Sequence, residues 1–326
     1  MAIRTDHPTS GPAVAGGLLA GVALDRVLGD PRRGHPVAVF GAAATRLEQR
    51  LYAPTRLRGA AYLALCLAAV VAPAVGAHRC LRTVPGGHTA AVALATWASV
   101  GATTLEREAE GIAAALERGD LADARNRLPR LCGRDPRDLD TSEISRATVE
   151  SVAENTSDAV VAPLFWGALL GLPGLLGHRV INTCDAMVGH RCARYTNFGW
   201  AAARLDDLAN WVPARLTALA TVATARFVGG SPTDTSHARA RYGRHHPSPN
   251  AGQCEAAFAG ALGVRLGGAN RYQHTVDHRP ELGSGRRPEP ADIRRAVRLG
   301  RAVTAVSTVV AAAAALALSR RAGGRP

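Results

Sequence analysis

Long apolar stretches without charge alternate with polar segments along this chain. Four of these stretches contain 17 to 19 residues each, at 59–77, 89–105, 159–177 and 302–319. Two shorter uncharged stretches cover residues 11–24 and 216–225. A helix needs about 20 apolar residues, and not fewer than about 17, to cross the ~30 Å hydrocarbon core of a bilayer. Because lipid-exposed backbone must satisfy its own hydrogen bonds, the pattern predicts an all-α, polytopic integral membrane protein with about five or six membrane helices.

Two longer polar segments, 106–158 and 229–301, interrupt the apolar stretches. In the first, apolar and acidic residues recur at helical spacing, and Asp120 is suited to cap a second helix. Thr141 or Ser142 is suited to cap a third. The second segment is rich in Gly, Pro and His up to residue 287, and we expect it to be mostly loop. We expect both segments to belong to a single membrane-embedded domain that comprises residues 1–326.

The charge of the chain is strongly positive, and its position suggests an orientation. The chain has 39 basic and 26 acidic residues, a net charge of +13, and every basic residue counted is Arg. Arg gathers at 26–58 and 229–301, beside the apolar stretches, so both segments should be cytoplasmic by the positive-inside rule. Aromatic residues are only 4%, and no nucleic-acid-binding motif is present, so we expect a lipid bilayer rather than nucleic acid as partner.

One apolar stretch, 159–177, carries an unusual number of helix-breaking residues. These are Pro163, Gly167, Gly171, Pro173 and Gly174. We expect this stretch to be broken or re-entrant, because irregular backbone at membrane depth is tolerated where protein or water covers it. Such a segment returns the chain to the side from which it came. The polar residues before and after it would then meet.

An acidic stripe leads into that stretch. Glu150, Glu154 and Asp158 are four residues apart, so a helix places them on one face, where like charges repel. The stripe is either a solvated helix face or, since it leads into a membrane segment, a functional site.

A second polar group follows the stretch. It contains Asp185, Asp206 and Asp207. Carboxylates are hard oxygen ligands for Mg²⁺, which favours one or two of them together with substrate phosphates. Nearby arginines are suited to bind phosphate with two hydrogen bonds; they are Arg191, Arg194 and Arg204. For Arg204 and Asp207 the alternative is a structural ion pair.

Several short motifs follow one another in a fixed order. They are Leu24–Pro31 with His35–Val37, Gly133–Asp135, Ser151–Asp158, Asn182–Gly189, Phe198–Ala201, Arg204–Asp207, and His246–Gly252 with Glu255–Ala257. In these motifs the chain resembles the adenosylcobinamide-phosphate synthases of cobalamin biosynthesis, the CobD/CbiB family. Gln253 and Cys254 stand where the family usually has Trp-Pro, a departure that removes no charged group.

The resemblance implies a membrane enzyme that forms an amide bond, a carbon–nitrogen ligase. It would join (R)-1-aminopropan-2-ol, or its O-phosphate, to the propionate carboxylate of adenosylcobyric acid, giving adenosylcobinamide (phosphate). Because amide formation in water is uphill, the resemblance implies ATP and Mg²⁺, although no nucleotide-binding motif is present. The active site would face the cytoplasm of the cell membrane, and other cobalamin-assembly enzymes are possible partners. Transport or channelling of corrinoids without catalysis is the alternative function, and a non-catalytic scaffold is a third.

The resemblance also implies roles for individual residues. The implied catalytic residues are Glu154, Asp158, Asp206, Asp207 and His246. The implied substrate-binding residues are Asn155, Asn182, Arg191, Arg204, Arg134, Asn250 and His35. The implied metal ligands are Glu154, Asp158, Asp185 and Asp206. Both histidines precede Pro in a loop, where a capping role is the alternative.

Overall fold

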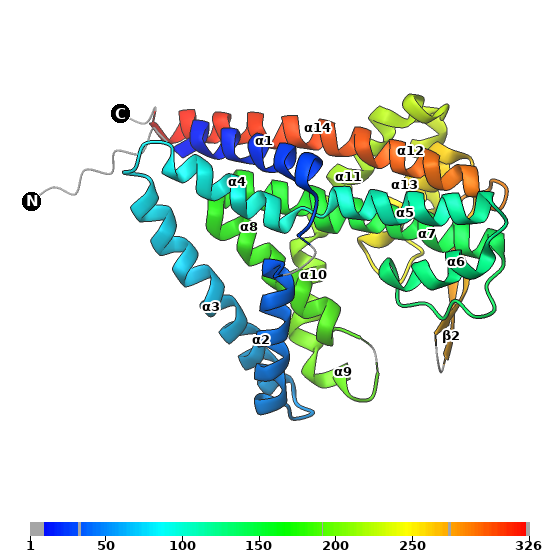
Figure 1. The fold of residues 1–326 in the computed structure, drawn as a ribbon, viewed down its shortest axis with the longest axis horizontal. Helices are drawn as coiled ribbons and strands as arrows, with labels where there is room; N and C mark the ends of the chain where they lie inside the picture. Colours follow the sequence, from blue (N-terminus) through cyan, green and yellow to red (C-terminus); the bar gives the residue numbers. More distant parts are fainter. Residues whose placement is uncertain (1–9, 32–33, 191, 273–274, 324–326) are drawn as a thin grey trace, which may run out of the picture. The chain divides into compact units, whose positions relative to one another are not determined.

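A computed structural model describes residues 10–31, 34–190, 192–272 and 275–323 (Figure 1). The chain folds into two compact units, each assembled from separated segments. The first unit consists of Met1–Gly101, Ala162–Ala209 and Thr308–Pro326. The second consists of Ala102–Val161 and Asn210–Ser307. The polar segments 106–158 and 229–301 both fall in the second unit. The single membrane-embedded domain of residues 1–326 stays a prediction.

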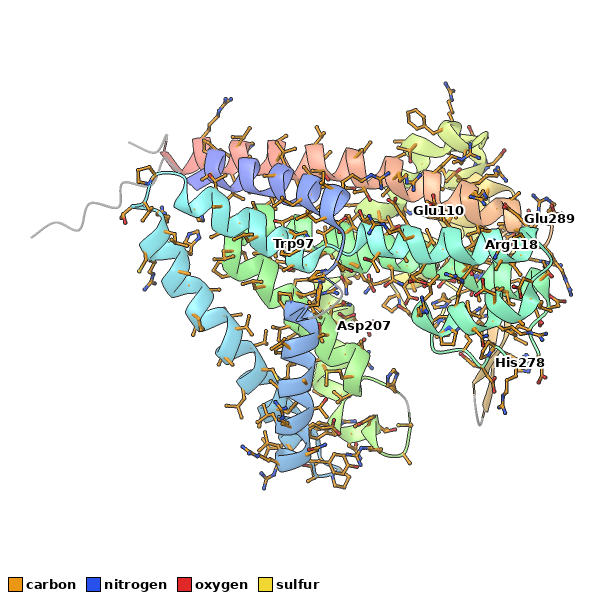
Figure 2. The ribbon with its side chains drawn as sticks, viewed as in Figure 1. Trp97, Glu110, Arg118, Asp207, His278 and Glu289 are labelled. Carbon is orange, nitrogen blue, oxygen red and sulfur yellow. The ribbon has the colours of Figure 1, made fainter. Side chains whose placement is uncertain are left out.

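The first unit is helical throughout its described part. Its helices are α1 (Ser10–Leu28), α2 (Pro36–Leu51), α3 (Arg56–Leu81), α4 (Gly87–Ser99), α8 (Ala162–Val188), α9 (Tyr195–Phe198), α10 (Trp200–Ala209) and the end of α14 (Pro290–Gly323). Helices α1 and α4 pack together, and α8 packs against α3 and α10. Gly59 of α3 has no side chain where the Phe198 carbonyl lies, so only Gly allows this approach. On α4, Trp97, labelled in Figure 2, donates a hydrogen bond to the Gly29 carbonyl at 3.0 Å.

Four helical segments among the described residues are long and apolar enough to cross a membrane. They are Gly11–Leu28, Arg56–Leu81, Thr141–Val188 and Pro290–Arg321. The all-α membrane protein predicted from the sequence is thereby confirmed. The uncharged stretch 89–105 is not one helix, however, because α4 ends at Ser99. The stretch 216–225 lies in α11, whose 14 residues extend for only about 21 Å at 1.5 Å per residue.

The expected break in the third of these segments is present in α8. Gly171 has φ 63° and ψ −145°, a conformation that L side chains rarely adopt. A Cβ on Gly167 would lie only 3.6 Å from the Cβ of Leu175, two helical turns further along the chain. In a straight helix these positions are about 12 Å apart. Helix α8 is therefore a hairpin of two arms that folds back at Gly171.

The second unit contains the remaining helices and one β-hairpin. Its elements are α5 (Ala102–Glu117), α6 (Leu121–Arg127), η1 (Leu128–Arg130), α7 (Thr141–Thr156), the π-helical η2 (Ser157–Val161), α11 (Trp211–Thr224), η3 (Ala225–Val228), α12 (Pro232–Tyr242), α13 (Ala251–Leu262), β1 (Leu266–Tyr272), β2 (Thr275–Leu282) and most of α14. Its core includes Ile112, Ile144, Phe258 and Ile293, which come from α5, α7, α13 and α14. Four helices thus enclose one apolar core.

Two local expectations for the second unit need correction. Asp140, not Thr141 or Ser142, caps α7, and it forms a capping box with Glu143. The segment after residue 229 is not mostly loop, because it forms α12, α13 and the antiparallel pair β1–β2. Gly267 and Gly268, both with positive φ, lie where the register of this pair shifts. The alternation of β1 is too irregular to be recognised from the sequence.

Candidate functional site

The residues implied by the sequence divide between the two units. The first unit contains His35, Asn182, Asp185, Arg204, Asp206 and Asp207. The second contains Arg134, Glu154, Asn155, Asp158, His246 and Asn250. Arg191 lies outside the described residues. Each unit is described separately below.

In the first unit, Asn182 and Asp206 are brought together. Asn182 Nδ2 donates to Asp206 Oδ1 at 3.4 Å, and Arg179 Nη1 donates to Asn182 Oδ1 at 3.5 Å. Asp206 is buried, although α10 also carries the more exposed Asp207 (Figure 2). Arg204 and Asp207 lie 3.9 Å apart and both face solvent, so their ion pair stabilises the fold very little.

Two other polar residues of the first unit have structural contacts. His35 caps α2, since its Nδ1 accepts from the Val37 amide at 3.2 Å. The ring proton then lies on Nε2, 3.4 Å from Asp30 Oδ1. The guanidinium of Arg194 donates to buried Glu48 at 3.0 Å. Arg194 is therefore paired with a carboxylate within the protein, and its binding of phosphate stays a prediction.

The second unit contains a buried charge cluster centred on Glu150. The cluster is formed by Arg134, Arg146, Glu150, Glu154, His246, Glu255, Asn270 and Arg279. Glu150 Oε2 accepts from Arg134, and its Oε1 accepts from the Gly267 amide at 2.6 Å and from Arg146 at 3.4 Å. The first carboxylate of the acidic stripe is therefore neutralised by two guanidiniums rather than solvated.

Arg146 connects α7 to the β-hairpin. Its guanidinium donates to the carbonyls of Gly267 and Ala269, the latter at 2.7 Å, and to Asn270 Oδ1 at 2.9 Å. These contacts fix β1 against α7. Strand β2, which carries His278 in Figure 2, pairs with β1 and brings Arg279 into the cluster.

His246 lies between Arg279 and Glu255. Its Nε2 is 3.2 Å from Arg279 Nη1 and 3.9 Å from Glu255 Oε1. A guanidinium can only donate, so Nε2 can accept from Arg279. Nδ1 lies 3.0 Å from the Ser248 amide, which donates, and 3.2 Å from the Ser248 carbonyl, which accepts. Burial, and secondly the charge of Arg279, lower the pKa of His246 below its usual range. The imidazole is therefore neutral and able to accept a proton.

The two remaining carboxylates of the cluster differ in exposure. Glu255 is 1% exposed, and burial, together with the nearby charges of Glu150 and Glu154, raises the pKa of Glu255 well above its usual range. Glu154 is exposed to solvent. Asn155 donates to the Ser151 carbonyl at 2.9 Å, within its own helix. Glu154 is thus the member of the acidic stripe that solvent reaches at this cluster.

Three buried polar atoms of the cluster have no hydrogen-bond partner among the described residues. They are Oε2 of Glu255, Nη1 of Arg134 and Nδ2 of Asn270. An unsatisfied buried polar group costs about 1–3 kcal/mol, and more when it is charged. One acceptor and two donors are therefore placed to bind a ligand that brings a donor and an acceptor of its own.

The predicted metal site is not assembled within either unit. Glu154 and Asp158 belong to the second unit, and Asp185 and Asp206 belong to the first. Among the described residues, no three His, Cys, Asp or Glu side chains are grouped to hold a metal ion. The implied ligands therefore do not form an Mg²⁺ site within one unit, and their binding of Mg²⁺ stays a prediction.

Sequence reasoning missed part of this cluster. Arg146 precedes Glu150 by four residues, a spacing that indicates an ion pair on a helix, and this signal was readable. Glu255 begins the motif Glu255–Ala257, but nothing in the sequence indicates that it is buried beside a histidine. Asn270 and Arg279 were missed because the hairpin that carries them was not predicted.

Comparison of the sequence with known proteins gives matches to one family. A sequence model described as CobD/Cbib protein matches residues 18–300. A relative from Mycobacterium tuberculosis is 54% identical over 297 residues, 90% of this chain and 94% of its own. Relatives from Chromobacterium violaceum and Rhodobacter capsulatus are 45% and 41% identical; the alignments cover 85% and 90% of this chain and 88% and 95% of theirs. All three are named cobalamin biosynthesis protein CobD. No solved structure matches the chain.

Proposed function

Because the chain belongs to the CobD/Cbib protein family and thus acts in cobalamin biosynthesis, we propose that it forms an amide bond. It joins (R)-1-aminopropan-2-ol, or its O-phosphate, to the propionate carboxylate of adenosylcobyric acid. The reaction consumes ATP and requires Mg²⁺. The resemblance described above supplies these substrates, and the chemistry of the buried charge cluster supports the type of reaction.

The proposed reaction proceeds in two steps. A carboxylate oxygen of the propionate attacks the γ-phosphorus of ATP, and the bond to ADP breaks, which leaves an acyl phosphate. The amine nitrogen then attacks the acyl carbon, the carbon–oxygen bond to phosphate breaks, and inorganic phosphate leaves. The amine must lose a proton to attack, so the site must bind a carboxylate, bind an amine and accept a proton.

The unsatisfied atoms of the cluster are the observation that carries the proposal. Arg134 Nη1 and Asn270 Nδ2 are donors suited to a carboxylate or acyl phosphate, and Glu255 Oε2 is an acceptor suited to an amine. His246, neutral and buried beside Glu255, accepts the proton of the amine. Arg279 occupies its Nε2 until an anionic substrate group competes for that guanidinium.

Reconstitution with defined substrates tests this function. Purified protein in detergent is given adenosylcobyric acid, each form of the amine, ATP and Mg²⁺, and the corrinoid product is measured by mass spectrometry. We expect amide formation that is lost without ATP and reduced by at least tenfold in Arg134→Met. Arg130→Met, which removes the exposed partner of Glu108, is the matched control and should retain activity.

The alternative of corrinoid transport without catalysis gives a different result. Proteoliposomes would then take up the corrinoid, while the detergent assay yields no amide with any form of the amine. Asp206→Asn tests the contribution of the first unit, because the buried Asp206 belongs to the implied site but not to the cluster. Cobalamin production that survives this substitution together with Arg134→Met would favour a scaffold without catalysis.

A further inference from the structure

Glu255 is an unusual residue in the second unit. It lies in the middle of α13, among buried neighbours that include Cys254, Ala256 and Phe258. Only 1% of its surface is exposed, yet its Oε2 has no hydrogen-bond partner in the described part of the chain. Its Oε1 lies 3.9 Å from His246 Nε2, too far for a hydrogen bond. Buried carboxylates are normally paired or hydrogen-bonded, so Oε2 is suited to accept from a donor that the described residues do not supply.

The guanidiniums around Glu255 are already engaged by other groups. Glu150 holds the guanidiniums of Arg134 and Arg146. Arg279 is near both Glu154 and Glu255, and it also pairs with the half-exposed Asp277 at 3.2 Å. The three carboxylates of the cluster thus face three guanidiniums, and among the described residues none of these donates to Oε2 of Glu255. A ligand that brings a hydrogen-bond donor would satisfy this atom.

We propose that Glu255 binds the ammonium group of the amine substrate and places it beside His246. This inference rests on the proposed function and adds the position and the charge of the amine subsite. An ammonium has three donors, and Glu255 Oε2 is an unsatisfied acceptor for one of them. The exposed Glu154 carries a second carboxylate of the same cluster and faces the solvent from which the amine comes. The guanidiniums of Arg134 and Arg279 lie near enough to disfavour a divalent ion.

Direct binding measurements test the subsite without turnover. (R)-1-Aminopropan-2-ol and its O-phosphate are each titrated by calorimetry into the full chain in detergent, in the absence of ATP and corrinoid. Propane-1,2-diol, in which a hydroxyl replaces the ammonium, is the neutral comparison ligand. We expect the wild-type protein to bind the amine at least tenfold more tightly than the diol. In Glu255→Gln, the affinity for the amine should fall by about 10- to 100-fold, the range for a hydrogen bond to a charged group.

The matched control is Glu281→Gln. Glu281 lies on β2, is 59% exposed and pairs with Arg265. This variant should bind the amine as the wild type does. If the wild-type protein binds the amine and the diol equally, the proposal is overturned. This comparison needs no variant, so the test remains valid even if Glu255→Gln does not fold. Unchanged amine affinity in Glu255→Gln, or Glu255-dependent binding of Mg²⁺ in place of the amine, also overturns it.

The outcomes separate this inference from the proposed function. If amide forms in the reconstituted reaction but Glu255→Gln leaves the amine KM unchanged, the reaction is right and the subsite is wrong. If the amine binds in a Glu255-dependent way but no amide forms under any condition, the subsite stands and the amide synthase does not.

Discussion

The pair of Arg134 and Glu150 provides the sharpest test of the structural reasoning. Their side chains are 7% and 3% exposed, so neither charge has water to replace a lost partner. Removing one member of a buried ion pair typically costs about 3–5 kcal/mol, because the other charge stays buried without compensation. Arg146 and the Gly267 amide still contact Glu150 when Arg134 is removed. We therefore expect the lower end of that range for Arg134→Met and the upper end for Glu150→Gln, which leaves two guanidiniums uncompensated.

The measurement is thermal unfolding in detergent, followed by the fluorescence of the four tryptophans. At an unfolding entropy of about 2.1 cal/mol/K per residue, a loss of about 3–5 kcal/mol corresponds to a fall in Tm of roughly 4–7 °C for a chain of 326 residues. The exposed pair of Arg130 and Glu108 is the control, and Arg130→Met should lower Tm by about 0–1.5 °C, because surface pairs contribute about 0–1 kcal/mol. The double variant Arg134→Met with Glu150→Gln should be more stable than the two single effects added together. Strictly additive effects, or an Arg134→Met protein as stable as Arg130→Met, would refute the buried ion pair.

Three further predictions concern chemistry, packing and orientation. The proposed role of His246 as a base, together with its lowered pKa, predicts that kcat/KM falls only when the pH drops below about 6.5. This acidic limb should disappear from the residual activity of His246→Asn, and a limb above pH 6.5 contradicts the assignment. Gly59→Ala should lower Tm, because the new Cβ would meet the Phe198 carbonyl at the end of α9, at a cost of about 1–3 kcal/mol. Gly41 of α2 has open space around it, so Gly41→Ala should raise stability by about 0.5–1 kcal/mol. Equal effects of the two substitutions would contradict the packing. Two single-cysteine variants, one retaining the exposed Cys80 and one the exposed Cys192, test the orientation in the membrane. A membrane-impermeant maleimide should label Cys80 in intact cells and Cys192 only after permeabilisation. The opposite labelling pattern would reverse the proposed topology.

The predicted Mg²⁺ ligands come from both compact units, and their binding of one ion stays a prediction. Glu154, Asp158, Asp185 and Asp206 have the oxygen ligands that Mg²⁺ prefers, but the structure assigns two of them to each compact unit. Residue type indicates which ion a group can bind. Only the tertiary structure decides which groups are near enough to bind the same ion.

The sequence by itself determined four of the predicted membrane helices, because the need for about 20 uncharged residues per span is a property of composition and length. The stretches 89–105 and 216–225 do not form such helices. The sequence also determined the break in α8, since Gly171 and Pro173 disturb a helix wherever it is placed. The motif residues Arg134, Glu154 and His246 lie in one charge cluster of the second unit, and their role as site residues stays a prediction.

The tertiary structure decided what these residues contact. Glu150 was read as part of an acidic stripe, but two guanidiniums and a backbone amide neutralise it. Arg279 and Glu255 are separated from Glu150 by more than a hundred residues of chain, and α13 and the hairpin bring them beside it. On the surface, water would screen these groups. Inside the second unit a buried charge needs a partner, and the described residues supply none to Oε2 of Glu255.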